Sequence, residues 1–118
     1  MHEYKKLNVW IDAMDLVTVI YQVTKNYPQE EKFGMISQIR RCAVSIPSNI
    51  AEGAGRNSDK EFANFLGIAN ASSFELETQL VISKNLGYIN ENDLAVFSDK
   101  IDKIQKMIFK LKKTILKD

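Results

Sequence analysis

The stretch from Ile36 to Arg56 constrains the fold most, because two helical faces of different chemistry run along it. One face is apolar and recurs at steps of three and four residues, which is typical of a helix packed in a bundle. The other face is polar but consists mainly of hydroxyls and amides, with one charge of each sign. Buried polar groups require hydrogen-bonding partners, so this second face predicts a polar network between packed helices. The apolar positions are Ile36, Ile39, Ala43, Ile46 and Ile50, and the polar ones are Gln38, Arg41, Ser45, Ser48, Asn49 and Glu52.

Pro47 lies inside this predicted helix. It has no N–H group to donate to the carbonyl of Ala43, and its ring crowds that carbonyl, so we expect the helix to kink at Pro47. Gly53 and Gly55 are expected to end the helix, as glycines past a helix C-terminus usually do. The start is expected near Pro28, although Gly34 weakens the first turns.

The first of three further amphipathic segments predicts a helix from about Leu7 to Tyr27, because the residue before Pro28 avoids helical geometry. Two adjacent apolar seams on it cover roughly 200° of its surface, about twice the width of one core-facing stripe. The first seam is Leu7, Trp10, Met14, Val17 and Tyr21, and the second is Val9, Ala13, Leu16, Ile20 and Val23. Such a helix must pack against two neighbours or against another copy of the chain.

A third helix is expected to start at Ser58, which forms a capping box with Glu61, and to end at Gly87. The fourth is expected to start at the N-cap Asn90 and to carry an apolar seam from Leu94 to Ile115. Glu75 and Gln79 on the third helix form a polar stripe that could answer the one on the second. The outer side of the fourth is rich in lysine and is expected to be a solvated face: Lys100, Lys103, Lys106, Lys110, Lys112, Lys113 and Lys117.

The chain is expected to be all-α, and residues 1–118 fit a single domain. Four amphipathic helices with short links predict an antiparallel up-down-up-down four-helix bundle. The excess apolar surface of the first helix, with Phe74 and Val81 off the main face of the third, predicts a symmetric homo-oligomer.

The chain also gives indications of its compartment. Cys42 is the single cysteine, which excludes an internal disulfide bond and favours a reducing cytoplasm. The first ten residues lack the apolar run of a signal peptide, and no window approaches a membrane span, so we expect no membrane association. A net charge of +1 argues against indiscriminate coating of nucleic acid by a monomer.

The run SQIRRCAVSIPSNIAEGAGR, followed by SDKEFANFLGIANASSFELETQL and LGYI, resembles the four-helix-bundle proteins encoded in intervening sequences of bacterial 23S rRNA. The resemblance takes in LNVWIDAMDLV and the Tyr27–Pro28 break, so it covers nearly the whole chain and is weakest in the last helix. It implies a ring-shaped homo-oligomer, most often a pentamer, with no known enzymatic activity. A similar fold serves as the accessory protein of diversity-generating retroelements, where a basic ring engages nucleic acid and a reverse transcriptase. The resemblance therefore implies an oligomer associated with RNA or DNA.

Four basic residues are candidates for phosphate contact: Arg40, Arg41, Arg56 and Lys60. Arginine suits bidentate phosphate recognition, and the positive end of the third helix lies next to Arg56. The structural alternative is an ion pair, which we favour for Arg41 with Glu52 or with a carboxylate of the third helix. For Arg40 and Arg56 both interpretations stay open. In a ring, each basic residue is repeated around the axis.

No catalytic, metal or cofactor site is expected. Glu52, Glu75 and Glu77 could suggest acid–base chemistry, but the only histidine, His2, lies in a terminus expected to be frayed. Cys42 has no histidine partner in view, and there is no zinc-type spacing or phosphate-binding loop. We therefore interpret the glutamates as structural, and we expect Trp10 and the phenylalanines in the core or at an interface.

Two functional hypotheses follow. In the first, a ring of subunits binds RNA or DNA through a basic surface. In the second, the same ring is a protein-interaction scaffold that docks a polymerase, such as a reverse transcriptase, or a ribosomal component without touching nucleic acid. A salt-dependent binding measurement distinguishes them, because phosphate contacts weaken steeply with salt.

Overall fold

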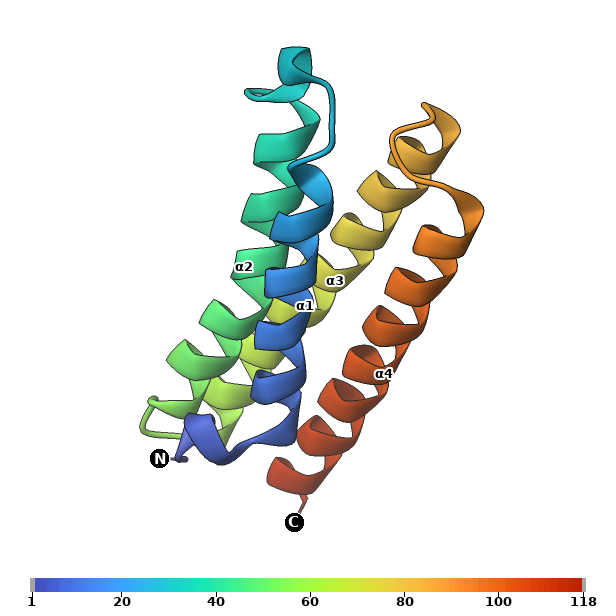
Figure 1. Ribbon diagram of the computed structural model, residues 1–118. Helices are drawn as coiled ribbons and strands as arrows, with labels where there is room; N and C mark the ends of the chain where they lie inside the picture. Colours follow the sequence, from blue (N-terminus) through green and yellow to red (C-terminus); the bar gives the residue numbers. More distant parts are fainter. Residues whose placement is uncertain (1, 118) are drawn as a thin grey trace.

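The computed structural model describes residues 2–117, and within that range the chain forms four α-helices and no strand (Figure 1). The predicted all-α class is therefore confirmed. Two short 3₁₀ turns precede the first and second α-helices. The elements are η1 (Tyr4–Lys6), α1 (Asn8–Thr24), η2 (Gln29–Glu31), α2 (Met35–Ala54), α3 (Asp59–Asn85) and α4 (Glu91–Ile115).

Helices that follow one another in the sequence pack side by side. The most extensive packing is between α2 and α3, and α1 also touches α4. Among the described residues, no Cα atom of α1 lies within 8 Å of one in α3, and no Cα atom of α2 lies within 8 Å of one in α4. Figure 1 shows both chain ends and the α2–α3 link at one end of the molecule, and the other two links at the opposite end. The molecule is elongated, with principal extents of 48 × 24 × 20 Å. No helix in the described range is long and apolar enough to cross a membrane.

All four helices contribute to one apolar core, and most positions of the predicted seams are buried or half-buried in it. Burying one such side chain contributes roughly 1.5–3 kcal/mol, so these positions dominate the stability of the bundle. On α1 the seam that contains Leu16 is buried apart from the half-buried Val23, whereas Met14 and Tyr21 of the other seam stay 41% and 39% exposed. The most buried large residues are Leu16, Ile20, Ile39, Ile46, Ile50, Phe62, Leu66, Leu76, Leu80, Ile101, Ile104 and Ile108.

The second helix starts later than expected, at Met35 instead of near Pro28. Gly34 interrupts the helix, with φ −112° and ψ −110°, a conformation far from helical. The Glu31 carboxylate takes over the capping, because its Oε1 accepts a hydrogen bond of 3.0 Å from the Met35 N–H. The η2 turn and this cap replace the predicted first turns.

Gly53 does not end the second helix, as had been expected, because α2 continues to Ala54 and Gly55 is its C-cap. Gly53 instead allows α2 and α3 to approach closely: a Cβ atom at this position would lie 2.5 Å from Phe65 Cβ and 3.0 Å from Phe62 Cδ1. Pro47 lies inside α2 and is buried. The kink at Pro47 stays a prediction.

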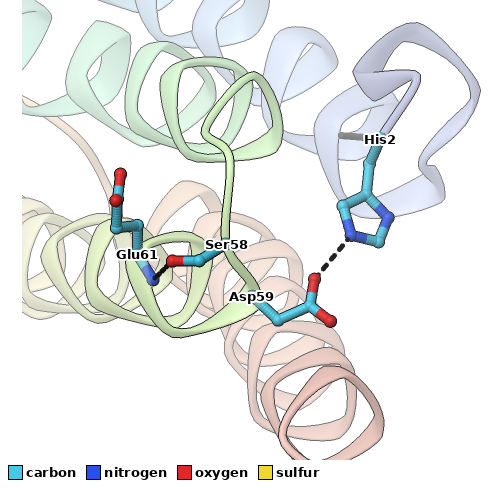
Figure 2. A network of polar contacts seen from close by, with 4 residues as sticks. All are labelled: His2, Ser58, Asp59 and Glu61. Carbon is cyan, nitrogen blue, oxygen red and sulfur yellow. Dashed lines mark hydrogen bonds and ion pairs between the residues drawn. The ribbon is translucent and has the colours of Figure 1, made fainter.

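The ends of α3 and the start of α4 follow the expected capping chemistry. Ser58 Oγ accepts a hydrogen bond of 3.1 Å from the Glu61 N–H (Figure 2). The reciprocal bond from the Glu61 side chain is not formed among the described residues, so half of the predicted capping box is present. Gly87 has φ +80°, and the Tyr88 N–H donates to the Ser83 carbonyl at 2.9 Å, which is the Schellman arrangement. Asn90 Oδ1 accepts from the Asp93 N–H at 2.7 Å.

The expectation that His2 lies in a frayed terminus is wrong. Its backbone N–H donates to the Ala54 carbonyl at 2.8 Å, and its ring lies 4.8 Å from the Phe62 ring. His2 Nε2 is 3.1 Å from Asp59 Oδ1, as Figure 2 shows. These contacts hold His2 against the end of α2 and the start of α3. Sequence periodicity gives no signal for such a contact between distant residues.

Candidate nucleic-acid interface

The four basic residues expected to contact phosphate do not form one patch. Arg40 and Arg41 lie in the second turn of α2, whereas Arg56 follows its end and Lys60 lies in the first turn of α3. A helix rises about 1.5 Å per residue, which places Arg40 roughly 24 Å from Arg56 along the axis. In Figure 1 the start of α2 and the α2–α3 link lie at opposite ends of the molecule.

Arg40 is held in place by α1. Its Nε donates to Thr24 Oγ1 at 2.8 Å, and its Nη2 donates to the Tyr21 carbonyl at 3.3 Å. The guanidinium also lies over the Tyr21 ring, 4.5 Å from the centroid. A cation at the C-terminal end of α1 donates to a carbonyl of the last helical turn and complements the helix dipole. Arg40 thus has a structural role, and the half-buried residue also lines a groove at the surface.

A groove between α1 and the start of α2 contains both Arg40 and Arg41, and we call it the α1–α2 groove. It carries three cations and no carboxylate, with aromatic and aliphatic side chains between them. Such a one-signed lining attracts anions and concentrates them locally. The lining residues are Tyr21, Lys32, Phe33, Ile36, Ser37, Arg40, Arg41, Val44 and Ser45.

Sequence reasoning missed Lys32 and Phe33 in this groove, because they lie in the link between η2 and α2, where helical periodicity says nothing. Phe33 is 88% exposed, and Lys32 Nζ lies 5.5 Å from the centre of its ring. Of the two expected positions, the core or an interface, the core is excluded for Phe33 and also for Phe74 and Phe109, which are 54% and 66% exposed. An interface position for these residues stays a prediction.

The polar stripe of α2 faces the polar stripe of α3. The hydroxyls of Ser45 and Ser72 share a hydrogen bond of 2.8 Å, and Asn49 Nδ2 donates to Ser45 Oγ at 2.9 Å and to its carbonyl at 2.8 Å. Gln79 is buried, and its Oε1 has no hydrogen-bond partner among the described residues. Ser48 is exposed and lies outside the groove between these stripes. That groove is lined by Gln38, Arg41, Cys42, Ser45, Ser72, Glu75 and Gln79.

The prediction that Arg41 forms an ion pair with Glu52 is wrong. Glu52 Oε2 lies 3.8 Å from Arg56 Nη2, one helical turn away, and the Arg56 guanidinium also lies 4.8 Å from the centre of the Phe65 ring. Arg41 is exposed and forms no ion pair with any residue in the range 2–117. Its guanidinium is therefore free to bind an anion where the α1–α2 groove meets the groove between α2 and α3, since Arg41 lines both.

The end of the molecule that carries Arg56 and Lys60 is less suited to an anion. Lys60 lies between Asp59 and Glu61 in the first turn of α3, and Glu52 lies beside Arg56. The positive end of the α3 dipole is already occupied by these carboxylates and by the Ser58 cap. Local negative charge offsets the two cations there.

The Cys42 thiol is not a poised nucleophile. Burial, and next to it the hydrogen bond and charge of Glu75, raise the pKa of Cys42 to about 11. A thiol with such a pKa stays protonated at neutral pH, and only the thiolate reacts. Within the described range, no three side chains of His, Cys, Asp or Glu gather in a way that could hold a metal ion.

Comparison with known proteins adds two findings. The chain matches the model of a family described as 23S rRNA-intervening sequence protein over residues 5–110. It is also similar to the crystal structure of a protein of unknown function from the S23 ribosomal protein family of Bacteroides thetaiotaomicron VPI-5482, with a TM-score of 0.80 and 26% sequence identity. That similarity covers 89% of this chain and 98% of the other. No curated protein matches the chain.

Proposed function

The chain belongs to the 23S rRNA-intervening sequence protein family, and from this premise we propose that it is a non-enzymatic homo-oligomer that binds RNA or DNA through a basic surface. The observation that carries the proposal is the α1–α2 groove, where Lys32, Arg40 and Arg41 line one surface without a carboxylate. Arginine and lysine side chains supply most of the affinity of proteins for the phosphate backbone.

The proposed subunit is an antiparallel up-down-up-down bundle with α2 kinked at Pro47, and the proposed assembly is a ring of five copies. The support is apolar surface that one copy leaves uncovered on several helices. Large contiguous patches of exposed apolar side chains mark interaction sites on proteins. A closed ring also repeats each cation around its axis. The exposed residues on α1 and α3 are Ile11, Met14, Tyr21, Ile68, Phe74, Val81 and Ile82.

The proposed contacts are those of Arg40, Arg41 and Lys32, rather than Arg56 and Lys60. The first group lines a groove without a carboxylate, and its acidic neighbours Glu31 and Glu75 lie outside that groove, whereas Asp59 and Glu61 directly flank Lys60. We place the protein in the cytoplasm, where a single free thiol such as Cys42 stays reduced. The proposal includes no cofactor and no metal.

The experiment is equilibrium binding of labelled RNA and DNA at several salt concentrations, on protein of known oligomeric mass. Log affinity should fall linearly with log salt concentration, with a slope of about −0.7 per phosphate contacted on a single strand. Arg41→Glu tests the groove because Arg41 is exposed and unpaired in the described structure. Lys60→Glu is the matched control, with the same change in charge at the other end of the subunit.

Arg41→Glu should weaken binding and flatten the salt dependence, whereas Lys60→Glu should leave both nearly unchanged. Equal losses in the two variants would contradict the assignment to the α1–α2 groove. Binding that is absent, or that does not depend on salt, would contradict nucleic-acid binding altogether.

The alternative proposal is a scaffold that docks a protein such as a polymerase or a ribosomal component. The observation in its favour is Phe109, which is 66% exposed on α4 and lies outside the basic groove. Under this alternative, Phe109→Ser would abolish capture of the partner, and nucleic acid would not bind in the salt series described above.

A further inference from the structure

We infer that the α1–α2 groove receives an unpaired nucleotide, whose base stacks on Phe33 while its neighbouring phosphates contact Arg40, Arg41 and Lys32. This inference rests on the proposed nucleic-acid binding and adds the class of nucleic acid: a single strand or an unpaired loop, in RNA or DNA.

The exposure of Phe33 is the first observation. At 88% it is the highest value among the large apolar side chains of the described residues, and the ring projects from a groove lined with cations. Phe33 therefore contributes little to the packing of the subunit. An exposed aromatic ring beside cations is the arrangement by which proteins hold single strands, with base stacking on the ring and phosphates on the cations.

The fixed position of Arg40 is the second observation. A guanidinium has five N–H donors, and Thr24 and the Tyr21 carbonyl each accept from one nitrogen. The other donors make no hydrogen bond with any described residue. Since the Tyr21 ring and these two acceptors already hold the group, a phosphate that binds it costs little additional side-chain entropy.

The preference for an unpaired base follows from geometry. In a duplex each base is stacked on its neighbours and offers only its edge, so the ring of Phe33 could not reach a base face. Tyr21 is a poorer platform, because its ring is 39% exposed and the hydrogen-bonded Arg40 guanidinium lies over it at 4.5 Å. The Phe33 ring is 88% exposed, and the only cation near it among the described residues is the ammonium group of Lys32 at 5.5 Å. Phosphate contact alone would favour the duplex, which has the higher charge density.

The test compares one oligonucleotide of about 12 nucleotides, without self-complementarity, as single-stranded RNA, single-stranded DNA and blunt duplex. Fluorescence anisotropy is measured at a fixed salt concentration with the wild type, Phe33→Ala, Phe33→Trp and Arg41→Glu. The control variant is Val96→Ala, which removes part of an apolar side chain that is 47% exposed on α4, outside the α1–α2 groove. Oligomeric mass and helical content are measured for every variant.

The wild type should bind the single strands more tightly than the duplex. Phe33→Ala should weaken single-strand binding by about 5- to 150-fold, the usual effect of removing one stacking ring, and leave duplex binding unchanged. Phe33→Trp should preserve or strengthen single-strand binding, Arg41→Glu should weaken binding of all three ligands, and Val96→Ala should change none of the affinities. Equal affinities for RNA and DNA are expected if base and phosphate alone are recognised; a preference for RNA would add contact with the 2′-hydroxyl.

Two outcomes overturn the inference without touching the proposed function. In one, Phe33→Ala binds like the wild type while Arg41→Glu is weakened, so phosphate contact exists without stacking. In the other, Phe33→Ala dissociates the oligomer, which would make Phe33 a subunit contact. If the wild type showed no salt-dependent binding, the proposed function itself would be contradicted.

Discussion

The Tyr88 hydroxyl donates a hydrogen bond of 2.7 Å to Glu31 Oε2, and this bond ties the α3–α4 link to the segment that precedes α2. The same carboxylate accepts from the Met35 N–H through Oε1, at 3.0 Å. One side chain thus caps α2 and joins two links at one end of the bundle. In the sequence, Glu31 directly precedes Lys32 and Phe33, which line the α1–α2 groove.

Glu31→Gln should make the protein less stable at neutral pH and flatten its response to acid. The Met35 N–H, and next to it the Tyr88 hydroxyl, lower the pKa of Glu31 from its ordinary value of 4.5. A carboxylate with a lowered pKa stabilises the native state above its ordinary pKa, and that stabilisation is lost as pH falls through the lowered value. Urea unfolding across the acid range measures the effect.

The control for this experiment is Glu30→Gln, an exposed neighbour in the same η2 turn. It should keep the acid response of the wild type. If Glu31→Gln and Glu30→Gln gave the same pH profile, the junction would have no measurable energetic role.

Gly53→Ala and Gly67→Ala should change stability in opposite directions. A Cβ atom at Gly53 meets Phe65 Cβ at 2.5 Å, so the α2–α3 contact must open, at a cost of roughly 1–3 kcal/mol. At Gly67 the nearest atom is Lys112 Nζ at 3.7 Å, so alanine should stabilise α3 by about 0.5–1 kcal/mol. Chemical denaturation measures both, and destabilisation by both substitutions would contradict the open space at Gly67.

Cys42 should react slowly with alkylating reagents in the folded protein. The pKa of the thiol is raised from 9.0 to about 11, which lowers the thiolate fraction about a hundredfold at mildly alkaline pH. Because the raised pKa favours the protonated native state, its contribution to stability should be complete below pH 9 and lost as pH rises towards 11. Reaction in denaturing urea gives the reference rate, and equal rates in both conditions would place the thiol at the surface.

His2→Ala should lower the free energy of unfolding by roughly 0.5–1 kcal/mol, because the contacts with Asp59 and the Phe62 ring are lost. Glu3→Ala is the matched control: it removes an ion pair with Lys6 that is 2.9 Å long but highly exposed. Exposed pairs of this kind contribute little. An unchanged unfolding curve for His2→Ala would mean that the N-terminal contact is not energetically important.

Periodicity and capping chemistry account for the parts of the fold that sequence reasoning predicted. The seam of α4 from Phe97 to Ile108 and the Gly87 turn depend on neighbours three or four residues away, and the sequence displays these directly. The start of α2 was misplaced because a local break at Gly34 outweighed the proline signal at Pro28. The tether of His2 depends on a residue 57 positions away, which one sequence does not reveal.

The candidate site was predicted only in part, and for a similar reason. Arg40 and Arg41 were identified from residue type, but their separation from Arg56 becomes visible only when the length of α2 is considered. Lys32 and Phe33 lie in a link, and there a pattern of apolar residues cannot distinguish a buried ring from an exposed one. The contact of Arg40 with Tyr21 and Thr24 depends on how α1 and α2 pack.

Sedimentation equilibrium at micromolar concentration tests the central claim most directly, since the proposed ring requires the apolar surface on α1 and α3 to be covered by other copies. We expect a single species of about five times the 13.5 kDa subunit mass. A stable monomer of 13.5 kDa over the same concentrations would contradict the ring, and with it the concentration of basic residues on which the proposed function depends.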